Sequence, residues 1–145
     1  MRNVTCCLLV VLFGSWSSSL GQSAPKFTSP KIVATFERLG QTNEIKPVTI
    51  YTPPQWGTFR ISVVMVLTVK GGGEFWYGYP QFVDAAGLNF GGEYVVALST
   101  SVPQTASAEF PIRAKAGKPI RFTVQPAGDT SGSKYNVWVV VEQLM

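Results

Sequence analysis

The sequence contains no histidine. This absence excludes Ser-His-Asp and Cys-His catalysis, zinc sites with histidine ligands, and the side chain that most often serves as a general base near neutral pH. The 2 cysteines, Cys6 and Cys7, both lie close to the N-terminus. A chain from which that segment is removed has no disulfide, no thiol nucleophile and no thiolate metal site.

Acidic residues are also scarce, with 8 Asp and Glu in 145 residues. Glycosidase chemistry needs only two carboxylates, but scattered acids are what any solvated sandwich shows. Asp84 and Asp129 lie in polar stretches without the spacing of a calcium loop, so turns explain them better than a metal site. We therefore predict a protein that is not an enzyme, with no catalytic residues, no cofactor and no metal.

Basic residues are more numerous, but the 12 Lys and Arg are spread singly along the chain and the formal net charge is only +4. A nucleic-acid interface requires cations clustered on one face. A mild positive balance favours solubility and gives a weak bias toward anionic surfaces. We expect no nucleic-acid partner.

The N-terminus has the order typical of a secretory signal peptide: Arg2, then an apolar run over 6–14, then small polar residues over 15–21. The apolar run is shorter than the roughly 20 residues that a membrane span requires. We predict that residues 1–21 are removed between Gly21 and Gln22 and that the protein is secreted or resides in the periplasm or cell envelope. An uncleaved anchor is the alternative.

Residues 22–30 contain two prolines and no periodicity, which indicates a flexible arm before one domain over 31–145. Within that domain, residues 57–69 alternate with period 2, as a strand with one buried face does. We expect this to be the central strand. Its predicted buried residues are Phe59, Ile61, Val63, Met65, Leu67 and Val69.

Seven further segments show strand patterns: 31–39, 46–52, 74–83, 93–100, 105–113, 118–125 and 135–142. Such spacing favours an all-β protein, an eight-stranded antiparallel jelly-roll-like β-sandwich. An immunoglobulin-like sandwich is the alternative, although the Cys…Trp…Cys pattern of true immunoglobulin domains is missing.

In 74–83, Gly78 and Pro80 indicate a bulge or an irregular edge, and 84–92 is predicted to be a loop. The residues predicted to face the core there are Phe75, Tyr77, Tyr79 and Val83. In segment 31–39, Ile32 is also predicted to face the core. In segment 118–125, Thr123 is predicted to face outward.

Three stretches carry a resemblance to a known group of proteins. YTP at 51–53 with GTFRISV at 57–63 resembles the opening of small jelly-roll modules of phage virion and tail-fibre type. AGKPIRFTV at 116–124 and YNVWVVVEQL at 135–144 resemble their closing strands. The resemblance implies a non-enzymatic, often oligomeric, surface or attachment role. The signal peptide departs from this group, whose members do not normally carry one.

Aromatic residues are the strongest candidates for an interaction site. Trp56 lies in a turn, and the strand register places Trp76, Phe82 and Trp138 on outer faces, where contiguous apolar surface usually marks a contact. We therefore expect a secreted structural or interaction module that forms a homo-oligomer. The alternative is a carbohydrate-binding module with a glycan or another cell-surface molecule as partner, and a hydrolase comes third. The candidate ligand or interface residues are Trp56, Trp76, Tyr79, Phe82 and Trp138.

Overall fold

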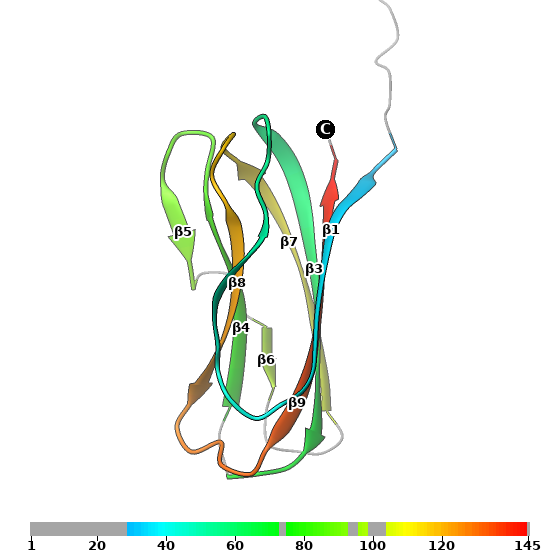
Figure 1. The fold of residues 1–145 in the computed structure, drawn as a ribbon, viewed down its shortest axis with the longest axis vertical. Coiled ribbons are helices and arrows are strands. Elements are labelled where there is room, and N and C mark those ends of the chain that lie inside the picture. Colours follow the sequence, from blue (N-terminus) through cyan, green and yellow to red (C-terminus); the bar gives the residue numbers. More distant parts are fainter. Residues whose placement is uncertain (1–28, 73–74, 93–95, 99–103, 145) are drawn as a thin grey trace, which may run out of the picture.

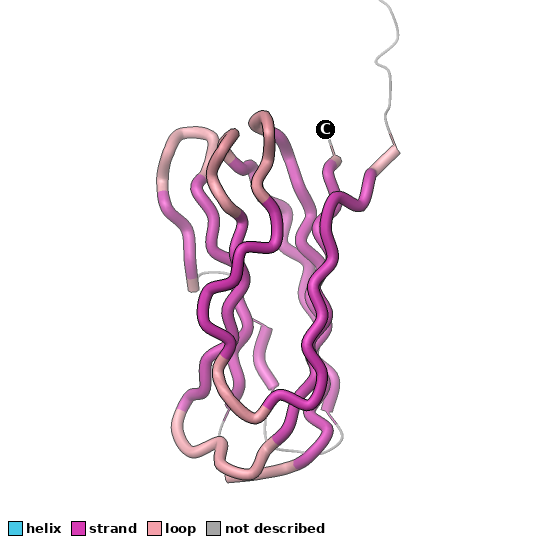
Figure 2. The backbone as a smooth tube through the Cα atoms, in the orientation of Figure 1, coloured by secondary structure: helices cyan, strands magenta, loops and turns pink. Residues whose placement is uncertain are grey.

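The computed structural model describes residues 29–72, 75–92, 96–98 and 104–144. All regular secondary structure in these residues is β-strand (Figures 1 and 2). The predicted signal peptide and most of the predicted N-terminal arm lie outside the described residues. The strands are β1 (Lys31–Gln41), β2 (Ile45–Tyr51), β3 (Gly57–Val69), β4 (Phe75–Val83), β5 (Asn89–Gly91), β6 (Val96–Leu98), β7 (Gln104–Ala114), β8 (Ile120–Ala127) and β9 (Lys134–Gln143).

The strands form two antiparallel sheets that pack face to face (Figure 1). One has the order β1-β9-β3-β7, and the other has the order β2-β8-β4-β5, with β6 also paired to β4. Both β5 and β6 pair with β4 on the side away from β8, so together they act as one interrupted edge strand. The sheet orders then become first-eighth-third-sixth and second-seventh-fourth-fifth, which is the jelly-roll arrangement. The predicted fold is confirmed, with β5 as an additional short strand within the predicted loop.

The predicted central strand β3 does lie inside its sheet, because it pairs with β7 on one side and β9 on the other. Its inward residues from Phe59 to Leu67 are almost completely buried, as the period-2 pattern predicts. The prediction is wrong only for Val69, which is exposed. Val69 lies beyond a register shift at the end of the pairing with β9.

The prediction for β4 is wrong, because the two faces of this strand are exchanged. Trp76, Gly78, Pro80 and Phe82 face the core, whereas Phe75, Tyr77 and Tyr79 face outward. The reason is local packing: a Cβ atom at Gly78 would lie 2.7 Å from Met65 Sδ and 2.8 Å from Phe122 Cζ. The glycine therefore lets core side chains from both sheets approach the strand closely.

The predicted irregularity in β4 is found on one side of the strand only, where the pairing changes register between Gly78, opposite Val96, and Gln81, opposite Gly91. The pairing of β4 with β8 runs from Phe75 to Gln81 without a register shift, and β4 has neighbours on both sides. Pro80, which cannot donate a backbone hydrogen bond, lies between the residues that pair with β6 and those that pair with β5. The interruption of the edge strand thus coincides with the proline.

Two further positions differ from the alternation pattern. Ile32 is exposed rather than buried, because a register shift between Ile32 and Ala34 exchanges the faces of β1. Thr123 is buried rather than exposed, and its hydroxyl donates a 2.7 Å hydrogen bond to the Ile45 carbonyl oxygen at a bulge in β2. A hydroxyl satisfied in this way can be buried at little cost. β2 is an edge strand of its sheet, a position that tolerates Pro47 because its backbone need not donate to a further strand.

Candidate functional site

The five residues predicted from the sequence as ligand or interface candidates do not form one surface. Trp76 and Phe82 are buried between the sheets, which contradicts their predicted outward orientation. Tyr79 lies on the outer face of the β2-β8-β4-β5 sheet, and Trp138 lies on the outer face of the other sheet. Trp56 lies in the segment that joins β2 to β3.

Trp76 is a core residue whose single hydrogen-bond donor is satisfied. The side chain is only 2% exposed, and its ring centroid lies 4.6 Å from that of Tyr135. The indole Nε1–H donates a 2.8 Å hydrogen bond to Ser133 Oγ, and that hydroxyl donates to the Thr130 carbonyl oxygen at 2.5 Å. A buried tryptophan usually finds such a partner, and here the partner ties β4 to the β8–β9 turn.

Trp56 is the most exposed large apolar side chain among the described residues, at 63%. The Arg113 guanidinium lies 5.8 Å from its ring centroid, near the outer limit of a cation–π contact. Two surface hollows of about 560 and 420 Å³ flank the ring, and Trp56 and Arg113 line both. The predicted exposure of Trp56 is confirmed, and its role as a ligand or interface residue stays a prediction.

The outer face of the β1-β9-β3-β7 sheet carries a contiguous apolar patch. Val64 of β3 lies directly opposite Trp138 of β9, with Val66 and Val140 at the adjacent outward positions of the two strands. Val64 is 37% exposed, and the other three side chains are partly exposed. We call these four residues the Trp138 patch. The predicted outward orientation of Trp138 is confirmed.

A charged group borders the Trp138 patch toward one end of the sheet. Arg60 Nη2 lies 2.6 Å from Glu142 Oε2, and its Nε donates to the same oxygen at 2.7 Å. Glu109 of the neighbouring strand β7 lies 3.9 Å from Arg60 Nη1. The hydrogen bond to Glu142, and then the charges of both carboxylates, raise the pKa of Arg60. The arrangement fixes an ion pair beside an apolar centre, which is how protein interfaces are composed.

The outer face of the second sheet carries an aromatic row that the sequence interpretation had placed in the core. Phe75, Tyr77 and Tyr79 project outward from alternate positions of β4. Phe75 is 43% exposed, and its ring is stacked on that of Tyr77 with a centroid separation of 6.0 Å. The Tyr79 hydroxyl donates to Gln125 Oε1 at 2.9 Å. The sequence signal for this orientation is the other face of the strand. Trp76, Gly78, Pro80 and Phe82 lie together on that face, and when it is buried the tyrosines point outward.

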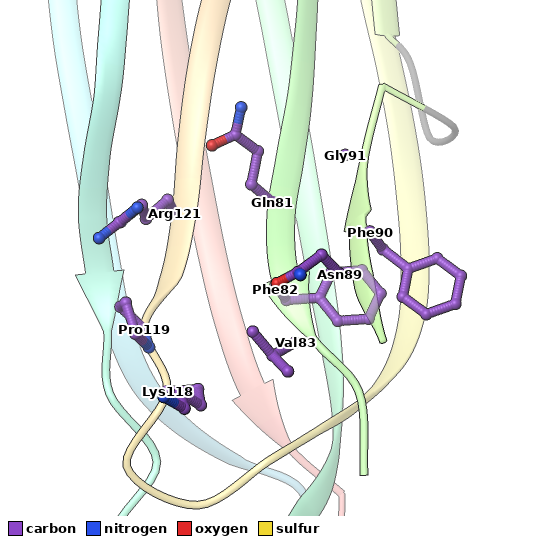
Figure 3. Close-up of a pocket in the computed structure, with 9 residues that line it drawn as sticks. All are labelled: Gln81, Phe82, Val83, Asn89, Phe90, Gly91, Lys118, Pro119 and Arg121. Carbon is purple, nitrogen blue, oxygen red and sulfur yellow. The ribbon is translucent and has the colours of Figure 1, made fainter. Parts of the chain in front are cut away.

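A surface depression of about 470 Å³ lies beyond the Gln81 end of this row (Figure 3). Gln81 and Arg121 come from paired positions on β4 and β8, and Lys118 and Pro119 lie just before β8. Phe90 and Gly91 of β5 complete the other side, where Phe90 stacks on Phe82 with centroids 5.2 Å apart. The lining therefore combines two cations and polar amides with an apolar wall.

The two aspartates considered as calcium ligands each cap a turn. Asp84 Oδ1 accepts a 2.7 Å hydrogen bond from the Leu88 amide, and Asp129 Oδ1 accepts a 2.9 Å bond from the Ser131 amide. Hydrogen bonds from the backbone and then the side chain of Ser131 lower the pKa of Asp129. Within the described part of the chain, no group of three or more acidic residues gathers as a metal site would require. Nor does that part contain a helix able to cross a bilayer.

Comparison with known proteins finds neither a matching family model nor a matching curated protein. Among solved structures, the chain is similar to the Eiger TNF of S. frugiperda, with a TM-score of 0.43 and 12% identity over 77% of this chain and 86% of that one. It is also similar to the globular domain of zebrafish complement 1qA, with a TM-score of 0.46 and 14% identity over 77% of this chain and 97% of that one. These are likenesses of fold, and the strand order above establishes the jelly roll independently.

Proposed function

We propose that this protein is a secreted, non-enzymatic interaction module that works as a homo-oligomer, with the Trp138 patch at the contact between copies. The observation that carries the proposal is the composition of the outer face of the β1-β9-β3-β7 sheet. The side of an antiparallel sheet that faces water is usually polar. Here Val64, Trp138 and their two valine neighbours instead form an apolar centre.

The geometry of this face supports a contact with a second copy. The pairings of β3 with β7 and β9 run in register from Phe59 to Leu67, so the face is regular over that length. An apolar centre with a polar border is the usual composition of a subunit interface. Closed symmetric homo-oligomers are the commonest assemblies of soluble proteins, and a second copy is the occupant we propose.

The carbohydrate-binding alternative does not fit the residues from which it was predicted. Of Trp56, Trp76, Tyr79 and Phe82, two are in the core and the other two lie on different parts of the surface. Secretion rests on the signal-peptide pattern of residues 1–21, and the relationship to phage virion modules rests on the sequence resemblance alone. Both stay predictions.

The proposed interface is tested by a charge placed at its centre. The full-length sequence is expressed in a secreting host, and the solution mass of the product is measured by light scattering after size exclusion. We expect an oligomer for the wild type and a monomer for Val64→Lys, because a desolvated lysine without a partner disfavours the contact. Leu88→Lys, at an exposed apolar loop position, is the matched control and should remain oligomeric. A wild-type monomer, or equal masses for both variants, refutes the proposal.

Secretion is tested on the same material by its intact mass. The proposed cleavage predicts a chain that begins at Gln22 and contains neither cysteine. A secreted product that retains Cys6 and Cys7 would contradict the assignment of residues 1–21 as a removable signal peptide.

A further inference from the structure

The outward aromatic row of β4 has the dimensions of an extended binding strip. Residues on one face of a strand recur about every 6.8 Å, so Phe75, Tyr77, Tyr79 and Gln81 together span about 20 Å. The inward positions between them are filled by Trp76, Gly78 and Pro80, whose packing fixes the strand. The aromatic side chains therefore stand on a rigid part of the fold.

The described residues beside the strip are small on the edge side and polar on the β8 side. On the edge side, Ala97 of β6 lies opposite Tyr77, and Gly91 of β5 lies opposite Gln81. At these two positions the neighbouring residues are too small to cover the Tyr77 ring and the Gln81 side chain. On the β8 side, Gln125 lies opposite Tyr77, and its side chain already accepts a hydrogen bond from Tyr79. Amides beside exposed rings suit a ligand that offers both hydroxyl groups and apolar faces.

The charge at the Gln81 end of the strip is uniformly positive. Lys118 and Arg121 line the depression there, together with the amides of Gln81 and Asn89, and no acidic residue is part of the lining (Figure 3). Among the described residues, the ion pairs found all involve Arg60 of the opposite sheet, which leaves Lys118 and Arg121 available for an anionic group. Their charges are complementary to a carboxylate or a sulfate.

We propose that the outer face of the β2-β8-β4-β5 sheet binds an anionic oligosaccharide. Lys118 and Arg121 contact its carboxylate or sulfate groups, and Tyr79, Tyr77 and Phe75 contact the apolar faces of successive sugar rings. Single-stranded nucleic acid also combines stacking with negative charge, but it needs cations along the whole backbone track. Here the cations lie at one end and the amide of Gln125 lies beside the row, which favours the glycan.

The site is tested with five probes on the secreted protein by titration calorimetry: a heparin hexasaccharide, a hexagalacturonate, the neutral maltohexaose, inorganic polyphosphate and a single-stranded oligonucleotide. We expect one or both anionic sugars to bind, with affinity that falls as salt is raised. Maltohexaose and polyphosphate should bind at least about tenfold more weakly, because each lacks one of the two recognised features. Binding of hexagalacturonate would show that carboxylates suffice, whereas binding of the heparin fragment alone, which carries both groups, would show that sulfate is required. Equal binding of polyphosphate, or of a single-stranded oligonucleotide, would overturn the proposal.

Matched variants separate this site from general attraction by a basic protein. Lys118→Gln with Arg121→Gln removes two charges at the strip, whereas Arg113→Gln with Lys115→Gln removes two exposed charges near Trp56. We expect a loss of about tenfold or more for the first pair and little change for the second. Tyr77→Ala should also weaken binding, with the solution mass and circular dichroism unchanged. Equal losses for both charge pairs, or unaltered binding in Tyr77→Ala, would refute the site without bearing on the proposed oligomer.

Discussion

Replacement of Trp76 by alanine distinguishes a core tryptophan from a surface ligand site. Trp76 is 2% exposed, packs on Tyr135 and hydrogen-bonds to Ser133. Truncation of a buried tryptophan costs about 3–5 kcal/mol, since the apolar transfer energy is lost and a cavity remains. A domain of this size has about 5–15 kcal/mol of total stability. We therefore expect Trp76→Ala to lose a large part of the free energy of unfolding.

The assay is urea unfolding followed by far-ultraviolet circular dichroism, at one fixed protein concentration because association would add to the apparent stability. Ser133→Ala should cost about 1–3 kcal/mol, since the buried indole N–H loses its acceptor. Trp56→Ala is the control, and its 63% exposure predicts a change within about 0.5 kcal/mol. Equal and small effects of Trp76→Ala and Trp56→Ala would refute the exchanged faces of β4.

Two further predictions concern the same core. Gly78→Ala should lower the free energy of unfolding by about 1–3 kcal/mol, because its Cβ would overlap Met65 and Phe122. Gly91→Ala, which would meet only the flexible Gln81 side chain, should change the urea midpoint much less, and equal shifts would contradict the packing described. Burial, with a contribution from the charge of Glu44, raises the pKa of Tyr135, whose hydroxyl donates to the Asn43 carbonyl oxygen. An unfolded tyrosine ionises near pH 10, so this contribution to stability is complete below about pH 10 and is lost as the pH rises further. Tyr135→Phe should show a shallower decline in stability above pH 10 than the wild type, and identical slopes would contradict the assignment.

The fold was predictable because most strands have one buried face and alternate cleanly. In β3, β7 and β9 the inward apolar residues recur at every second position as the pattern predicts, apart from Val69 at the end of β3, although β3 and β9 also carry the outward apolar residues of the Trp138 patch. The exceptions arise where pairing shifts by a residue, as at Ile32, or where a hydroxyl finds a buried acceptor, as at Thr123. Neither event leaves a local signal in the sequence, because both depend on a neighbouring strand.

The surface residues were harder to predict, because both faces of β4 are aromatic. Alternation places Phe75, Tyr77 and Tyr79 on one face of β4 and Trp76 and Phe82 on the other. If apolar content alone decided which face is buried, the face with three aromatic residues would be assigned to the core. The choice is made at Gly78, an inward position that Met65 of the opposite sheet and Phe122 approach closely, and Pro80 faces inward on the same side. Residues that looked like strand breakers thus determine which aromatics reach the surface. Trp138 and Trp56, whose strand or turn positions were unambiguous, lie on the surface as predicted.

The central claim is that a second copy covers the Trp138 patch in solution, and thiol accessibility tests it most directly. In a protein from which the proposed cleavage has removed Cys6 and Cys7, Val64→Cys supplies a single thiol at the patch, and Leu88→Cys supplies one at an exposed loop. The account predicts that the thiol at position 64 reacts slowly with a maleimide at high protein concentration and faster on dilution, whereas the rate at position 88 stays constant. Equal rates for the two thiols at every concentration would contradict it.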